Sequence, residues 1–173
     1  MRLYKSLLLL FAVIMTVACS SGKSEIITVE NGQFIKNGKP YYFIGTNMWY
    51  ATVLASEGEG GDRERLSREL DSLKSIGIDN LRILVGADGD CSLPCKVEPM
   101  LQTAPGKYND TLLRGLDYLL VEMGKRDMQA VLYLNNSWEW SGGYSQYLTW
   151  AGYGKAPIPR IDGYSNFETF VGN

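Results

Sequence analysis

The chain has 173 residues, of which 45% are hydrophobic, 12% aromatic and 21% charged, and its formal net charge is −2. This composition is that of an ordinary globular protein and excludes a disordered or fibrous chain. Because the chain contains no histidine, its own residues can build neither a His-ligated zinc site nor a nucleophile activated by a histidine base.

Residues 1–18 have the pattern of an export signal. Arg2 and Lys5 precede a short apolar run, residues 7–15, and small residues follow before Cys19. The run is too short to cross a bilayer as a helix. The segment resembles a bacterial lipoprotein signal, in which cleavage leaves the cysteine as a lipidated N-terminus.

The residues around the expected cleavage point leave alternatives open. Ala18 fits such a signal, whereas Thr16 stands where leucine is usual, and a plain secretory signal or a chance cysteine are the other readings. Residues 19–27 then form a polar tether. Ser20 resembles the residue found in lipoproteins sent to the outer membrane, so we expect an outer-membrane, cell-surface or periplasmic protein held to the membrane by Cys19.

Removal of residues 1–18 leaves 15 basic and 19 acidic residues, a net charge of −4, and nothing in the sequence favours a nucleic acid partner. Cys91 and Cys95 remain in a polar loop, in a compartment where disulfides persist. We expect a small disulfide loop, because no second pair of metal ligands accompanies them. Two free thiols are the alternative.

Short β-rich runs separated by turns occupy residues 25–46. Two Asn-Gly pairs, at 31–32 and 37–38, predict a β-hairpin. The hairpin is expected to lead into a first buried strand, Tyr42 to Gly45.

A helix is predicted over residues 63–76. Its leucines and isoleucine recur at steps of four, three and three, which places them on one face, and Asp62 and Gly77 are expected to cap its start and end. Residues 81–85 predict a buried strand, residues 110–125 a second amphipathic helix and residues 131–134 a third strand.

Strands that alternate with helices predict a parallel sheet with right-handed crossovers. No glycine-rich nucleotide loop follows a strand, so a (β/α)8 barrel is favoured over an open nucleotide-binding sheet. About 155 residues follow the signal, whereas such a barrel needs roughly 250. Residues 28–173 are therefore expected to be the first three or so β/α units of a truncated barrel. Ser165 and Glu168 predict a capping box that opens a further helix.

Aromatic and amide side chains follow the predicted strands, at the end where barrels place their active sites. The flat faces of Trp49 and Trp138 suit sugar rings, which stack their C–H faces on aromatic rings. Packing is the alternative, and it is at least as favoured for Trp140 and Trp150.

Arg82 stands inside an otherwise apolar strand, where a charge is costly unless it is paired. We expect its partner to be a carboxylate in the mouth of the barrel. A head group that simply reaches solvent at the strand end is the alternative.

Four long blocks carry a family resemblance: "FIGTNMWY", "IDNLRILVGADG", "VEPMLQTAPGKYNDTLLRGLDYLL" and "AVLYLNNSWEWSGGYSQYLTWAG". In this order they resemble the endo-β-1,4-mannanases of glycoside hydrolase family five. The resemblance covers about residues 28 to 155. It implies a (β/α)8 barrel that hydrolyses internal β-1,4-mannosidic bonds with retention, using two glutamates and neither a metal nor an organic cofactor.

The resemblance also assigns roles to residues. Arg82 matches an arginine beside the nucleophile, Trp49 an aromatic after the first strand and Trp138 a tryptophan that lines the substrate cleft, while Asn47 and Asn136 are further polar candidates. The segments that carry both catalytic glutamates have no counterpart in this chain, and Glu139 does not match either. A mannan-binding fragment without activity and a related cellulase are the alternatives.

Overall fold

The computed structural model describes residues 26–89 and 97–172. They form two compact units, of which the first ends at Tyr42 and the second begins at Phe43. The first unit is an antiparallel sheet of β1 (Thr28–Glu30), β2 (Gln33–Lys36) and β3 (Lys39–Pro40). Each Asn-Gly pair lies at positive φ between two strands, the backbone that tight hairpin turns require. The predicted hairpin is confirmed, and β3 extends it by one strand.

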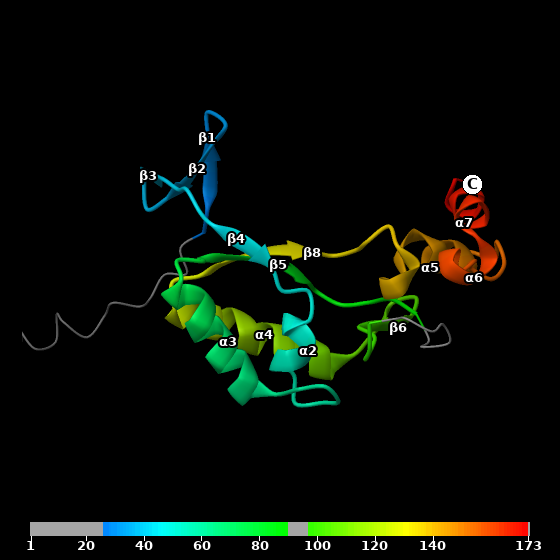
Figure 1. The fold of residues 1–173 in the computed structure, drawn as a ribbon, viewed down its shortest axis with the longest axis horizontal. Helices are drawn as coiled ribbons and strands as arrows, with labels where there is room; N and C mark the ends of the chain where they lie inside the picture. Colours follow the sequence, from blue (N-terminus) through cyan, green and yellow to red (C-terminus); the bar gives the residue numbers. More distant parts are fainter. Residues whose placement is uncertain (1–25, 90–96, 173) are drawn as a thin grey trace, which may run out of the picture. The chain divides into compact units, whose positions relative to one another are not determined.

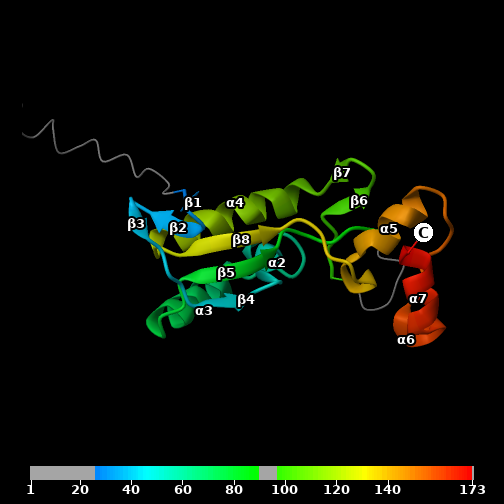
Figure 2. The same cartoon turned by 90° about the horizontal axis from the view of Figure 1, so that it is seen from above.

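The second unit is built on a parallel sheet in the order β4 (Gly45–Asn47), β5 (Asn80–Leu84), β8 (Gln129–Tyr133), shown in Figure 1. The helices α2 (Ala51–Ala55), α3 (Arg63–Ser75) and α4 (Asp110–Lys125) lie along one face of this sheet (Figures 1 and 2). The predicted order of strand, helix, strand, helix and strand is therefore confirmed, with α2 as an additional short helix.

The first parallel strand begins later in the chain than predicted. The expected strand from Tyr42 to Gly45 is wrong, since β4 starts at Gly45 and the Tyr42 side chain is 78% exposed. Gly45 pairs with Asn80, the first residue of β5, and before this pair only one backbone hydrogen bond continues, from the Asp79 N–H to the Ile44 carbonyl at 3.2 Å. An apolar run forms a strand only where a partner backbone lies beside it.

The core lies between the sheet and the three helices. Leu81 and Ile83 of β5 point to the helices, where they pack with buried residues of every layer: Met48, Ala51, Leu54, Ala55, Leu66, Leu70, Leu119, Met123 and Met128. Gly115 of α4 lets α2 approach closely, because a Cβ there would come within 2.9 Å of Ser56 Cα and of the Thr52 carbonyl oxygen.

The helix α4 has the predicted bounds, and α3 begins where the sequence predicts and ends one residue earlier, at Ser75. Asp62 accepts a hydrogen bond from the Arg65 backbone N–H at 2.8 Å, which caps α3, and Gly77 follows at φ +88°. Asn109 caps α4 in the same way, through the Thr111 N–H at 3.0 Å. Ile76 departs from the predicted stripe, because it lies just beyond α3 and is 71% exposed.

Shorter elements fill the rest of the unit: β6 (Gln102–Ala104), β7 (Lys107–Tyr108), η1 (Glu139–Ser141), α5 (Gly143–Trp150), α6 (Pro159–Asp162) and α7 (Tyr164–Val171). The capping box predicted at Ser165 is wrong, because Ser165 lies within α7 and Gly163 precedes the helix without a side-chain cap. The Asp162 carboxylate accepts a hydrogen bond from the Ile158 N–H at 2.7 Å, and this bond stabilises the preceding helix, α6.

Some predictions fall outside the described residues. The signal, Cys19, Cys91 and Cys95 belong to this group. Within residues 26–89 and 97–172, no helix is long and apolar enough to cross a membrane.

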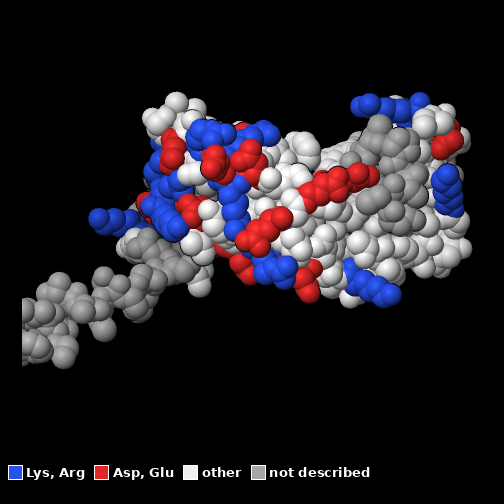
Figure 3. All heavy atoms as spheres, turned by 90° about the horizontal axis from the view of Figure 1, so that it is seen from below, with Lys and Arg blue, Asp and Glu red and all other residues white. Residues whose placement is uncertain are grey.

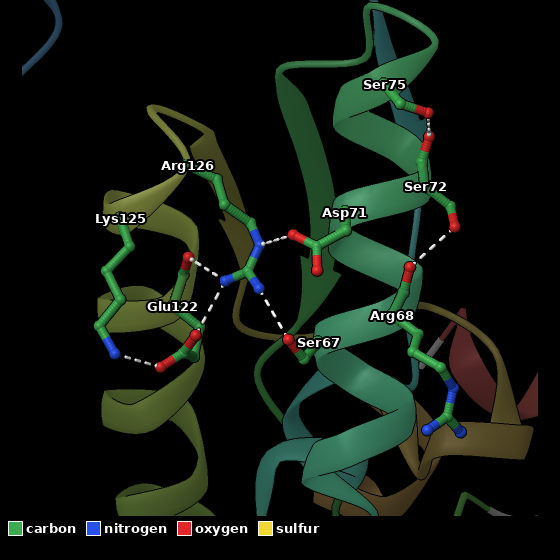
Figure 4. Close-up of polar contacts among 8 residues, drawn as sticks. All are labelled: Ser67, Arg68, Asp71, Ser72, Ser75, Glu122, Lys125 and Arg126. Atoms are coloured by element: carbon green, nitrogen blue, oxygen red, sulfur yellow. Dashed lines mark hydrogen bonds and ion pairs between the residues drawn. The ribbon is translucent and has the colours of Figure 1, made fainter.

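Arg126 joins α3 to α4 on their outer surface (Figure 4). Its guanidinium donates to Asp71 at 2.7 Å and to Ser67 at 2.8 Å on α3, and to the Glu122 carboxylate at 2.8 Å on α4. Lys125 also binds Glu122, at 2.5 Å. Charged side chains of both signs gather over these helices (Figure 3).

These contacts lower the pKa of two carboxyl groups. Hydrogen bonds from Lys125 and then Arg126 lower the pKa of Glu122, and the hydrogen bond from Arg126 lowers that of Asp71. A carboxyl group whose pKa is lower in the folded state stabilises the fold above its unfolded pKa of about 4, and this contribution is lost as the pH falls through the folded pKa.

Arg126→Ala is therefore expected to lower the free energy of unfolding at pH 7 by roughly 1–3 kcal/mol, because it leaves a largely buried Glu122 with one cation fewer. It should also flatten the loss of stability between about pH 4 and pH 2. Urea unfolding followed by circular dichroism measures both effects. Arg68→Ala is the matched control, since Arg68 is exposed and its ion pair with Glu64 is long, at 3.9 Å. Parallel stability curves for Arg126→Ala and the wild type would contradict this role.

Candidate functional site

The carboxyl ends of the three parallel strands carry a row of polar side chains on the face that the helices leave open. Asn47 of β4 lies opposite Arg82 of β5 in the sheet register, so both side chains point to this face. Arg82 Nη1 donates to Asn47 Oδ1 at 3.4 Å, and its guanidinium carbon lies 3.8 Å from the centre of the Tyr133 ring. The predicted neighbours Asn47 and Arg82 are brought together.

Arg82 is exposed although both of its sequence neighbours are buried. Its place on the uncovered face explains why a charged residue is tolerated in an apolar strand. Among the described residues, no carboxylate lies within ion-pair distance of its guanidinium, and its contacts are an amide oxygen and an aromatic ring. The expected carboxylate partner therefore stays a prediction.

The sequence did not reveal a polar network that lies beside this row. Asp88 follows β5 and is buried, and its two carboxylate oxygens accept hydrogen bonds from Gln102 Nε2 at 3.1 Å and from Asn135 Nδ2 at 3.4 Å. Gln102 Nε2 also donates to the Tyr147 hydroxyl at 3.1 Å. Burial raises the pKa of the Tyr147 phenol, and the negative charge of Asp88 raises this pKa further.

This network joins three loops that are far apart in the sequence. Gly142 is held against the Asp88 backbone at φ +87°, and a Cβ there would come within 2.1 Å of the Asp88 carbonyl oxygen. The Asp88 N–H in turn donates to the Ser141 carbonyl at 3.0 Å. The segment that carries Trp138 is thus fixed to the end of β5.

Asn136 helps to shape the turn before Trp138. Its side-chain Oδ1 accepts a hydrogen bond from the Trp138 backbone N–H at 2.8 Å, and its own N–H donates to Asn135 Oδ1 at 2.5 Å. These are the local hydrogen bonds by which Asn residues form turns. The side-chain Oδ1 of Asn136 is therefore already bonded within the loop, and a role of Asn136 as a polar liner of the cleft remains a prediction.

Two tryptophans near the strand ends are exposed. Trp49 is 46% exposed and contacts Tyr50 and Trp140 edge to face. Trp138 is 44% exposed, and its ring lies nearly parallel to that of Phe167, with 5.7 Å between ring centres and an interplanar angle of 11°. Each exposed indole offers apolar surface to a flat ligand.

The other two tryptophans pack within the protein. Trp140 packs against a buried cluster that includes Leu84 and Met100, and Trp150 contacts Tyr147 edge to face at 5.4 Å. Glu139, between Trp138 and Trp140, is buried in η1, and its Oε2 atom has no hydrogen-bond partner in the described part of the chain. Because it is buried, it cannot meet a bulky polysaccharide.

A hollow of about 390 Å³ lies along the edge of β4, between this strand and α3. Its lining includes Asn47, Arg65 and Glu69, and Glu69 accepts hydrogen bonds from Tyr50 at 2.7 Å and Arg65 at 2.6 Å. In a closed barrel each strand has a neighbour on both sides, so this edge is where another strand would pair. We therefore do not assign the hollow to a substrate.

The residues of the site offer no metal centre. Within the described ranges, no three Cys, Asp or Glu side chains converge to hold a metal ion.

Comparison with known proteins places this site in a family. Residues 24–173 match the family described as GH family 5 beta-mannosidase-like, and the chain belongs to this family of glycoside hydrolases. Its solved relatives are (β/α)8 barrel enzymes, which confirms the predicted fold class for the part of the barrel that the chain contains.

Particular relatives show how much of such an enzyme the chain represents. Mannan endo-1,4-beta-mannosidase 1 of Arabidopsis thaliana is 28% identical over 134 residues, which are 78% of this chain and 31% of that protein. The chain thus spans about a third of the length of the curated relatives that it matches.

Two solved structures differ in how closely they match. A variant of the glycoside hydrolase family 5 mannosidase of Rhizomucor miehei, in complex with mannosyl-fructose, has a TM-score of 0.79 and 34% identity and covers 84% of this chain and 36% of its own. The endo-1,4-beta-mannanase of the same fungus has a TM-score of 0.58 and 22% identity, with 84% and 40% covered, and supports the fold alone.

The effect of replacing Arg82 on the free energy of unfolding shows whether this residue serves the fold or the site. Arg82→Gln should lower the free energy of unfolding by less than about 1 kcal/mol, because an exposed guanidinium over a ring contributes little. Leu81→Ala, its buried neighbour, should cost roughly 2–5 kcal/mol. Urea unfolding of the two variants measures the difference, and equal losses would show that Arg82 serves the fold.

Proposed function

We propose that this chain supplies the substrate-gripping side of a β-1,4-mannan hydrolase that cleaves internal bonds with retention outside the cell. The observation that carries the proposal is the open row of Asn47 and Arg82 at the strand ends, together with the exposed indoles of Trp49 and Trp138 in the segments that follow β4 and β8. Membership of the glycoside hydrolase family 5 supports it. Indole faces bind the apolar face of a pyranose, and amide and guanidinium groups bind its hydroxyls.

Arg82 is proposed to act on the nucleophile. Retention requires two carboxyl groups about 5 to 5.5 Å apart, one that attacks the anomeric carbon and one that donates and then accepts a proton. A cation beside the attacking carboxylate keeps it ionised. We propose, from the family resemblance, that both glutamates belong to β/α units outside these 173 residues, and no described carboxylate lies beside Arg82.

The substrate is proposed to be an internal stretch of mannan. Curated relatives are named mannan endo-1,4-beta-mannosidases, and these names support the choice of mannan over cellulose and of internal over terminal bonds. No metal or organic cofactor is part of the proposal.

The purified chain is expected to bind mannohexaose and to release no reducing ends from mannan. Isothermal titration and a reducing-sugar assay measure the two properties. Release of reducing ends above a blank would show that the chain carries its own catalytic pair, and absence of binding would contradict the proposed function. Cellohexaose tests the choice of sugar, because equal affinity for it would remove the preference for mannan.

Trp138→Ala is the variant that tests the site within this experiment. Loss of one stacked sugar should weaken mannohexaose binding at least fivefold, or about 1 kcal/mol. Tyr108→Ala removes an aromatic ring of β7 that is also exposed, and it should leave the affinity unchanged.

We further propose that Cys19 anchors the protein to a membrane after export, which the sequence of residues 1–24 supports. In a bacterial host fed with labelled palmitate, the wild-type chain should carry the label in the membrane fraction. Cys19→Ser should lose both the label and the membrane association. An unlabelled wild-type chain in the soluble periplasmic fraction would instead indicate a plain secretory signal.

A further inference from the structure

Phe167 of α7 lies directly against the indole of Trp138. The two rings are nearly parallel, at 11° and 5.7 Å between centres, and Phe167 is 3% exposed whereas Trp138 is 44% exposed. Tyr164, one turn earlier on α7, contacts the same indole edge to face at 6.4 Å. One helix therefore supplies two ring contacts to one exposed tryptophan.

The helix that carries Phe167 is itself held in place. The Asp162 carboxylate closes α6 through the Ile158 N–H at 2.7 Å, and the Phe167 N–H donates to the Gly163 carbonyl at 3.3 Å. α7 also packs against α6 and α5. Phe167 therefore lies on a helix that packs against its neighbours.

Trp138 stands on a segment whose backbone is fixed by Asn136, but a backbone hydrogen bond does not set the angle of an indole ring. The aromatic contacts to the indole among the described residues come from Tyr164 and Phe167. Of these two, only Phe167 lies parallel to the ring. A flat side chain that is stacked in this way resists rotation of the indole out of its plane.

We infer that Phe167 is a positioning residue, which fixes the ring plane of Trp138 so that its exposed surface is ready for a sugar. This inference rests on the proposed function of Trp138. Phe167 is too deeply buried to touch a polysaccharide, so it acts through the indole. A ring held in its bound orientation loses less conformational freedom when the ligand binds, and the affinity is correspondingly higher.

Phe167→Leu is the variant that separates orientation of the Trp138 ring from mere occupation of an apolar space. Leucine keeps the site apolar, but its branched chain cannot stack on an indole. Phe167→Tyr keeps the flat ring and should restore the behaviour of the wild type. Leu119→Val, in the core between the sheet and the helices, is the control for a general loss of stability.

Fluorine NMR of the chain labelled with 5-fluorotryptophan gives a readout that needs no ligand. The four tryptophans should give four resonances, and Trp138→Phe assigns one of them. In Phe167→Leu the Trp138 resonance is expected to shift and broaden while those of Trp49 and Trp150 stay in place. Loss of the Phe167 ring current moves the resonance in any case, so a Trp138 resonance as sharp as in the wild type would overturn the inference.

Titration with mannohexaose gives the second readout. Phe167→Leu should weaken binding at least threefold, whereas Phe167→Tyr and Leu119→Val should stay within twofold of the wild type. Equal weakening in Leu119→Val, or wild-type affinity in Phe167→Leu, would overturn the positioning role. If the wild-type chain does not bind, the proposed function fails, and the broadening of the Trp138 resonance then decides whether Phe167 fixes the indole.

Discussion

The site depends on the parallel register of β4, β5 and β8. Asn47, the last residue of β4, pairs with Arg82, and the last residues of β5 and β8, Leu84 and Tyr133, pair with each other, so the carboxyl ends of all three strands lie at one edge. In an antiparallel sheet the end of one strand lies beside the start of the next, and these residues would lie at opposite edges. Register alone therefore places an arginine, an amide and a tyrosine ring together, although they are more than thirty residues apart in the sequence.

The same register gives the sheet one face that packs against the helices and one face that stays open. Leu81 and Ile83 face the helices and join the core, while Arg82, between them, faces the open side. Because side chains alternate along a strand, a shift of one residue would bury the arginine and expose both apolar residues. The hydrophobic core that stabilises the fold thus also enforces the orientation of the charged residue proposed to act in the site.

The sequence predicted those parts of the molecule that local chemistry determines. The cap at Asp62, the two Asn-Gly turns and the bounds of α4 all depend on residues within a few positions of one another, and all are confirmed. The strand predicted from Tyr42 fails for a non-local reason, since its length is set by where β5 begins. The box predicted at Ser165 fails because α7 already begins at Tyr164, so Ser165 lies within the helix and Gly163 precedes it without a side-chain cap.

Contacts across long stretches of chain were beyond prediction. Trp138 could be chosen from its place after a strand, but its partner Phe167 lies on a later helix with no spacing that links them. The bonds of Asp88 to Gln102 and Asn135 likewise join segments that only the folded chain brings together.

The division between sheet and loops also bears on where proteins of one fold can differ. Over 84% of its length the chain matches both a mannosidase and an endo-mannanase of the same fungus, at TM-scores of 0.79 and 0.58, and the second likeness concerns the fold alone. Proteins that share a fold differ mainly in the segments beyond the ends of their strands, where α5, α6 and α7 lie after Trp138 in this chain (Figure 1). Phe167, which stacks on one ring in that region, lies where such a difference can arise without any change in the common sheet.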